Sequence, residues 1–190
     1  MKNLKKLTTL LCAILICATM FTMVASAAHL APQVSTNTYG AKNAVMVLQK
    51  MLNYKMGAGL TTDGWYGTKT KNAVIAFQKK AFPNESNEWD GICGQKTWKA
   101  LFQSCTVRKG NKNNMVLVVQ HILNKLYDNK KITLYSRLVE DGDFGSATLN
   151  AVDRFQEKYG LGRDGIVGPE TWNELIYQYN LLTFDTAFSK

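Results

Sequence analysis

Histidine, cysteine and proline are scarce in this chain, and their scarcity narrows its chemistry. The 190 residues include 2 histidines, 4 cysteines and 3 prolines. Two histidines cannot build a multi-histidine metal centre. They also leave few residues that could serve as the base of a histidine-dependent catalytic triad. Apolar residues make up 46% and charged residues 19% of the chain, which is ordinary globular composition. The length predicts one or two small domains.

The first 27 residues have the features of an export signal. Positive charge comes first, from Lys2, Lys5 and Lys6. An uncharged, largely apolar stretch follows over residues 7–24, and then the small-residue pattern Ala25-Ser26-Ala27. This order predicts a cleaved secretory signal peptide over residues 1–27. An uncleaved membrane anchor is the alternative, but residues 28–38 carry none of the charges that usually flank a span.

Cleavage changes the charge and the cysteine count. The chain has 23 basic and 14 acidic residues, and the signal holds three of the basic ones, so the exported form carries +6. Cys12 and Cys17 leave with the signal, whereas Cys93 and Cys105 stay. These two either pair in an oxidising compartment or pack as separate thiols, and a helix expected between them disfavours pairing. We interpret residues 28–39 as a flexible leader.

From residue 40 onward, the sequence contains a tandem repeat of one unit. Five residues recur 71 positions later: Val45, Leu48, Gln49, Leu52 and Asn53 against Val116, Val119, Gln120, Leu123 and Asn124. Later blocks match at shifts of 78 and 74, so the copies differ in length near residues 79–89 and 125–139, which we place in loops. We divide the chain into copy one (residues 40–105), copy two (residues 106–180) and a C-terminal tail (residues 181–190).

A shorter motif, Asp-Gly-x-apolar-Gly-x-x-Thr, occurs four times. It spans residues 63–70, 90–97, 141–148 and 164–171, which we call junctions 1 to 4. Asp-Gly is typical of a turn, because glycine adopts positive φ without strain. The second glycine is placed to cap a helix, as the Gly168-Pro169 pair indicates, and the threonine falls where its hydroxyl bonds back into the capping turn. Each copy is therefore predicted to hold two turn-to-helix junctions.

Between the junctions the apolar residues recur with helical spacing. Examples are Val45, Leu48 and Leu52 in copy one and Trp172 with Leu175 in copy two. We predict three helices per copy, at roughly residues 42–54, 68–80, 95–103, 113–127, 146–159 and 169–179. Gln49 and Gln120 lie one step off the apolar stripe, and we expect each to bond to a loop backbone. The fold class is all-α, with two tandem three-helix bundles after the signal peptide.

The combined pattern resembles a known family. Val-x-x-Leu-Gln-x-x-Leu-Asn, the junction motif, Ala-Val-x-x-Phe-Gln and a second junction ending in Thr-Trp are similar to the peptidoglycan-binding domain of bacterial cell-wall proteins. The resemblance covers about 135 residues and implies a three-helix bundle that attaches secreted proteins to the murein wall, without a catalytic role. Copy one departs from the family pattern at Lys42 and Cys93, so its groove is expected to differ.

Peptidoglycan offers sugars and carboxylate-bearing peptides, which suit exposed aromatic faces and the N-termini of helices. We therefore expect the ligand-binding residues at and beside the junctions. The candidates are Trp65, Tyr66, Lys69 and Trp89 in copy one, and Asp143, Phe144 and Arg163 in copy two. Tyr66 and Phe144 occupy the apolar position of their junctions, which also favours a core role. Trp65 is aligned with a polar residue, Asp143, which predicts an exposed ring.

Motifs for catalysis or metal binding are weak in this sequence. No Gly-x-Ser-x-Gly elbow occurs, and Cys93 has no histidine in its own copy. Glu140, Asp141 and Asp143 lie close together in the sequence, but in a turn where copy one has Thr62, Asp63 and Trp65, which argues against a glycosidase carboxylate pair. The same stretch lacks the alternating acidic residues and the closing glutamate of a calcium-binding loop. We expect no catalytic residue, no metal and no cofactor. A cell-wall lytic enzyme, or an accessory subunit of a cell-wall hydrolase, is the alternative.

Charge differs between the copies. Copy one has nine lysines and four acidic residues, whereas copy two has ten basic and nine acidic residues. A basic copy one favours attraction to anionic wall polymers, which salt would screen, although an ordinary solvated surface explains the charge equally well. The expected partners are peptidoglycan, with cell-wall hydrolases and anionic wall polymers as further candidates. We expect a secreted, wall-associated protein with no nucleic-acid partner and no membrane contact after signal cleavage.

Overall fold

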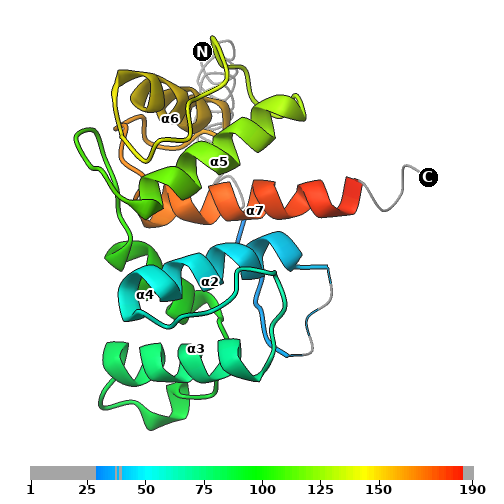
Figure 1. The fold of residues 1–190 in the computed structure, drawn as a ribbon, viewed down its shortest axis with the longest axis vertical. Helices are drawn as coiled ribbons and strands as arrows, with labels where there is room; N and C mark the ends of the chain where they lie inside the picture. Colours follow the sequence, from blue (N-terminus) through cyan, green and yellow to red (C-terminus); the bar gives the residue numbers. More distant parts are fainter. Residues whose placement is uncertain (1–28, 37, 39, 186–190) are drawn as a thin grey trace, which may run out of the picture.

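A computed structural model describes residues 29–36, 38 and 40–185 of the chain. The predicted signal peptide and the last five residues of the predicted tail lie outside this range. The described residues form α2 (Lys42–Met56), α3 (Thr68–Ala81), α4 (Gln95–Ser104), α5 (Asn114–Asp128), α6 (Ser146–Lys158) and α7 (Pro169–Asp185), with a 3₁₀ turn η2 (Ser86–Glu88). The prediction of an all-α protein with two three-helix bundles is confirmed (Figure 1). None of the helices in the described part is long and apolar enough to cross a membrane.

The four helices that follow the junctions begin at the predicted glycines. Gly67, Gly94 and Gly145 are the N-cap residues of α3, α4 and α6, and each has an extended backbone. α7 starts in the same way, because the Trp172 N–H donates to the Gly168 carbonyl at 2.8 Å.

A tryptophan fills the centre of each bundle. Trp98 of α4 and Trp172 of α7 are both fully buried, and each stands on the helix that follows the second junction of its copy. The buried apolar residues around them come from all three helices of the same copy: Leu48, Leu52, Val74 and Leu101 in copy one, and Val119, Leu123, Val152 and Leu175 in copy two. Replacing a buried tryptophan with alanine typically costs about 3–5 kcal/mol, so these rings dominate the stability of their bundles.

The two copies pack closely against each other. α7 contacts α2 and α4 of copy one as well as α5 of its own copy, and α2 also contacts α5. Figure 1 shows α7 lying between α5 and α2, so the last helix of copy two forms part of the interface. Val47 of α2 and Val118 of α5 are buried here, at 2% and 4% exposure. The hydrophobic core is therefore continuous across both copies.

The prediction of a flexible leader over residues 28–39 is wrong for residues 31–34. Ala31 and Val34 are buried, and Val34 exchanges two backbone hydrogen bonds with Cys93, at 3.2 and 3.0 Å. Trp98 Nε1 also donates to the Pro32 carbonyl. Copy two repeats this arrangement, because Val107 pairs with Val167 and Trp172 Nε1 donates to the Cys105 carbonyl. Residues 31–34 are thus the first segment of copy one.

The tail also differs from its prediction. We expected the last helix to end near residue 179 and a separate tail to follow, but α7 continues to Asp185 and Leu182 is buried. The helix continues because its last turns contact copy one, where Asn180 and Thr183 donate hydrogen bonds to the Gly40 carbonyl.

The two cysteines in the described part of the chain are not joined. Cys93 and Cys105 are both buried and both free, with α4 between them. The structure therefore contains two separately packed thiols and no disulfide between these residues.

Candidate functional site

All four junctions are held by the same side chain, a glutamine on the preceding helix. In junction 1, Gln49 Oε1 accepts a hydrogen bond from the Gly64 N–H at 3.0 Å, while Gln49 Nε2 donates to the Trp65 carbonyl and to Thr70 Oγ1. Gln78, Gln120 and Gln156 make the equivalent bonds in junctions 2 to 4. The expected bond from Gln49 and Gln120 to a loop backbone is thus present, and it fixes the shape of each junction.

The junction aspartate completes the turn. Asp63 Oδ1 accepts hydrogen bonds from the Trp65 N–H and from Gln49 Nε2, both at 2.9 Å. The Trp65 N–H and then Gln49 lower the pKa of Asp63 below its ordinary value, and the equivalent donors, Asp143 N–H and Gln120, lower the pKa of Asp141. Gly64 has φ of +75°, and a Cβ atom there would lie 2.8 Å from the Lys42 carbonyl oxygen. Only glycine therefore fits at this place.

Trp65 is the exposed aromatic residue of junction 1, as expected from its alignment with Asp143. Its side chain is 73% exposed. It lines a shallow pocket of about 330 Å³ together with Thr36, Lys42, Asp63 and the Gly64 backbone. Lys69, on the first turn of α3, is also exposed. The pocket combines an aromatic face, a turn and a positive charge.

Tyr66 and Phe144 belong to the core and are corrections to the candidate list. Tyr66 is 5% exposed and its hydroxyl donates to the Gly91 carbonyl at 2.7 Å, while Phe144 is 0% exposed. Burial raises the pKa of Tyr66 far above its ordinary value. Both rings point away from solvent and cannot touch a ligand, because the apolar position of each junction closes over the bundle. Tyr66 is nevertheless among the residues that line the pocket.

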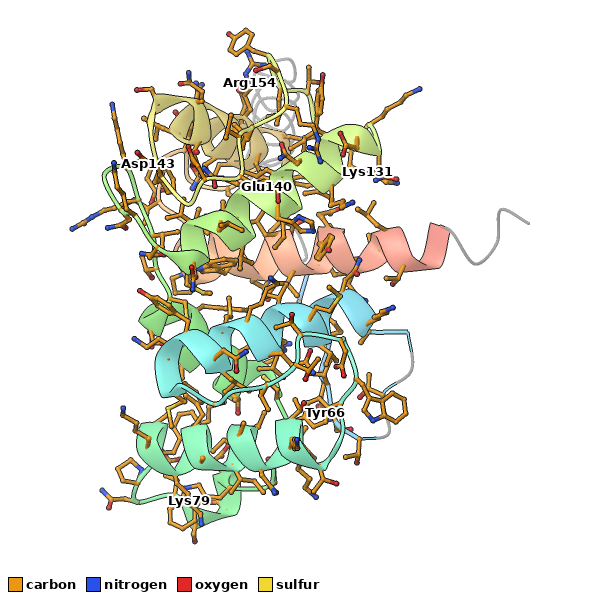
Figure 2. The ribbon with its side chains drawn as sticks, in the orientation of Figure 1. Tyr66, Lys79, Lys131, Glu140, Asp143 and Arg154 are labelled. Atoms are coloured by element: carbon orange, nitrogen blue, oxygen red, sulfur yellow. The ribbon has the colours of Figure 1, made fainter. Side chains whose placement is uncertain are left out.

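Trp89 does not lie beside Trp65. Its indole Nε1 donates to the Phe82 carbonyl at 3.0 Å, and the ammonium of Lys79 lies 5.5 Å from its ring centre. These partners are at the C-terminal end of α3, whereas Trp65 precedes the N-terminal end, and Figure 2 shows Lys79 and Tyr66 at opposite ends of that helix. A helix of 14 residues is about 21 Å long. Trp89 therefore closes the longer loop of copy one and does not share the pocket.

The candidates of copy two are engaged with neighbouring side chains. Asp143 forms an ion pair with Lys112 at 2.9 Å, and this contact raises the pKa of Lys112 above its ordinary value. Arg163 lies 3.7 Å from Glu157, near junction 4 rather than junction 3. The structure therefore does not gather the copy-two candidates at one place.

A larger groove lies between the copies, and the repeat pattern does not predict its shape. It has a volume of about 720 Å³ and is lined by α4, by junction 4 and by Leu30, which precedes copy one. Phe102 and Lys99 come from one copy and Asp164 and Glu170 from the other. Its lining depends on how the bundles pack, which no repeat pattern encodes.

Possible reactive groups are few in the described part of the chain. No three or more histidine, cysteine, aspartate or glutamate side chains there are arranged to hold a metal ion. His121 Nδ1 lies 3.0 Å from Glu140 Oε2, and the Tyr179 hydroxyl lies 3.4 Å from His121 Nε2. This contact joins α5 to α7, so it links elements of the interface.

Comparisons with known proteins agree with this geometry. The model of the peptidoglycan-binding domain family matches the chain twice, at residues 41–101 and 112–175. No solved structure matches significantly.

Among curated proteins, a probable N-acetylmuramoyl-L-alanine amidase of Bacillus licheniformis is 35% identical over 131 residues, covering 60% of this chain and 36% of its own length. An N-acetylmuramoyl-L-alanine amidase of Mycobacterium tuberculosis is 35% identical over 120 residues, covering 59% of this chain and 27% of its own length. A zinc D-Ala-D-Ala carboxypeptidase of Streptomyces albus G is 58% identical over 43 residues, 23% of this chain and 16% of its own length.

The chain thus spans 36% or less of the length of these relatives. The two family matches coincide with the two helical bundles, and each contains two glutamine-held junctions. The chain belongs to the peptidoglycan-binding domain family and carries that domain in two tandem copies.

Proposed function

We propose that this protein is exported, binds the peptidoglycan of the bacterial cell wall and has no catalytic activity of its own. The observation that carries the proposal is the tandem family match over two bundles, one of which holds an exposed tryptophan beside a shaped turn. Attachment to the wall is the role: the protein anchors or targets an activity that another protein supplies.

Co-sedimentation with purified sacculi tests this function. The exported form, without residues 1–27, is mixed with sacculi and centrifuged, and the fraction of protein in the pellet is measured against protein alone. We expect the protein to pellet with sacculi and to remain in the supernatant without them. Protein that stays in the supernatant at every sacculus concentration contradicts the function.

Association with cell-wall hydrolases is the finer part of the proposal. The curated relatives include N-acetylmuramoyl-L-alanine amidases, of whose length this chain covers 36% or less, and this similarity supports an association with such hydrolases. A turbidity assay separates attachment from lysis. We expect purified protein to leave the turbidity of a sacculus suspension unchanged, whereas clearing by the protein alone establishes the lytic alternative.

Attraction to anionic wall polymers is a third element, since copy one carries nine lysines against four acidic residues. Binding through charge weakens steeply as salt rises, because screening shortens the range of the interaction. Pelleting with sacculi stripped of anionic polymers is expected to persist. Loss of pelleting on stripping, together with steep salt dependence, assigns the binding to the polymers instead.

A further inference from the structure

Junctions 1 and 3 occupy equivalent places in the two copies, but their surroundings differ. In copy two, residues 110–113 run beside junction 3 as a short extended segment. Three backbone hydrogen bonds join them: Gly110 N–H to the Phe144 carbonyl, Phe144 N–H to the Asn111 carbonyl and Asn113 N–H to the Gly142 carbonyl, at 2.9–3.0 Å. The Lys112–Asp143 ion pair adds a side-chain contact. The edge of junction 3 is therefore covered by the chain itself.

In copy one the described residues leave the equivalent edge without backbone hydrogen bonds. Among the described residues, no hydrogen bond joins the backbone of residues 40–42 to that of Gly64, Trp65 or Tyr66. The Gly40 carbonyl, equivalent to that of Asn111, accepts from Asn180 and Thr183 of α7 instead. Gly40 thus contacts α7 where Asn111 contacts junction 3, while Lys42 still lies against Gly64. The 330 Å³ pocket lies in the space between residues 40–42 and junction 1.

Open backbone groups at this edge match an extended peptide. The Tyr66 N–H and carbonyl have no hydrogen-bond partner in the described part of the chain, whereas the same groups of Phe144 are both paired. An edge with a free donor and acceptor binds another extended segment by continuing the hydrogen-bond pattern. Residues 110–111 of copy two show this pairing within the same molecule.

The side chains around the pocket indicate the chemistry of that peptide. Trp65, 73% exposed, replaces Asp143 and offers an apolar face in place of an ion-pair partner. Lys42 is exposed, lies close enough to Asp63 to lower the pKa of that carboxyl, and forms no ion pair within the described residues. An exposed lysine beside an aromatic face fits an acidic peptide with an apolar surface.

We propose that copy one alone carries the working site, and that it takes a murein stem peptide in extended form: the peptide pairs with the Tyr66 backbone, packs on Trp65 and places a carboxylate at Lys42. This inference rests on the proposed function. In copy two, residues 110–113 fill the equivalent edge. Copy two therefore provides no second site, and its α7 packs against copy one.

The test compares intact sacculi with sacculi whose stem peptides have been removed enzymatically, so that only glycan strands remain. Wild-type protein is expected to bind intact sacculi and to bind the stripped glycan at least ~10-fold more weakly, as is typical when the central contact of an interface is lost. Equal binding to both materials overturns the stem-peptide inference and leaves the function intact. If the protein binds neither intact sacculi nor stripped glycan, the proposed function itself is wrong.

Matched variants test which copy binds. Trp65→Ala is expected to lower affinity for intact sacculi by ~10-fold, as for an aromatic hot-spot residue, while Asp143→Ala, at the equivalent position, leaves it unchanged. Circular dichroism confirms that both variants remain helical. Equal losses in the two variants overturn the assignment to copy one.

Amide hydrogen exchange gives a readout that needs no variant. A soluble disaccharide-peptide fragment of murein is added to wild-type protein. Exchange of the Tyr66 amide is expected to slow at least ~10-fold when the fragment saturates the site, since the N–H becomes hydrogen-bonded. The Phe144 amide, already bonded, is expected to be unaffected. An unchanged Tyr66 amide at saturation overturns the backbone pairing.

Discussion

The side chain of Asn180, near the end of α7, accepts a hydrogen bond from the Ala44 N–H in the first turn of α2, at 3.3 Å. Its amide nitrogen donates to the Gly40 carbonyl just before that helix. The residue preceding α2, Ala41, makes no side-chain cap, whereas Asn113 caps α5 by accepting from the Met115 and Val116 N–H groups. A residue of copy two therefore supplies the cap that copy one lacks.

Asn180→Ala is expected to lower the free energy of unfolding by about 1–2 kcal/mol, because it removes a helix cap and leaves the buried Ala44 N–H without its partner. Urea unfolding followed by circular dichroism measures the change. Asn113→Ala, which removes the local cap of α5, is the matched control and is expected to cost a similar amount. A neutral Asn180→Ala beside a costly Asn113→Ala contradicts capping between the copies.

Gln78→Ala tests the glutamine that holds junction 2. Gln78 is 1% exposed, and its loss leaves the Gly91 N–H without its partner and removes one of the two donors to the Ile92 carbonyl. We expect a loss of about 2–3 kcal/mol, the usual cost of stranding buried polar groups. Gln103, an exposed residue of α4, is the control, and its alanine variant should fall within about 0.5 kcal/mol of wild type in the same urea titration.

Val34→Ala tests whether the segment before residue 40 is part of the fold. Val34 is 0% exposed, and a truncation of this kind in a packed core costs about 2 kcal/mol. Thermal and urea unfolding give the value. Val107→Ala, the equivalent change in copy two, should cost about as much. If Val34→Ala matches wild type while Val107→Ala does not, residues 31–34 are dispensable.

Lowering the pH is expected to destabilise the fold through junctions 1 and 3. The pKa values of Asp63 and Asp141 are lowered in the folded protein, so the unfolded chain binds protons more tightly. Their contribution to stability is present above the unfolded pKa of about 3.9 and is lost as the pH falls through the lower folded value.

Thermal unfolding at a series of pH values between about 6 and 2 measures this effect, over the window in which aspartates titrate. The double variant Asp63→Asn, Asp141→Asn keeps an acceptor oxygen at each turn but has no carboxyl to titrate. Its unfolding temperature should therefore fall less steeply than that of wild type below about pH 4. Parallel curves for the two proteins refute the assignment.

The two thiols are expected to be inert in the folded protein. Burial raises the pKa of Cys105 to about 11 and that of Cys93 well above its ordinary value, so neither forms the reactive thiolate near neutral pH. A disulfide reagent should react with both only after denaturation in guanidinium. Rapid modification of either thiol in native protein shows that α4 opens locally.

Local features were predictable from the sequence, whereas features that depend on contact between the copies were not. The glycine caps and the glutamine contacts follow from residues a short distance apart along the chain, and the alignment of Trp65 with Asp143 indicated its exposure. The same alignment left Tyr66 and Phe144 ambiguous, because an apolar residue in a turn serves either a core or a ligand. Their burial settles that question.

The role of residues 31–34 was missed because one buried valine per copy is too short a pattern to detect. Val34 and Val107 are 73 positions apart, but the residues between them and the first helix of each copy differ. The length of α7 was missed for another reason. Its last turns are held by Gly40 and by α2, so nothing within the helix itself marks the end.

Because α7 lies against both bundles, neither bundle is a freestanding domain. A fragment that stops at residue 105 would leave Val47 and the start of α2 facing water, and a fragment that begins at residue 106 would do the same to Val118. Expression of either half alone should give aggregation or a poorly ordered chain. Truncation experiments on this protein are therefore best replaced by point substitutions in the intact tandem.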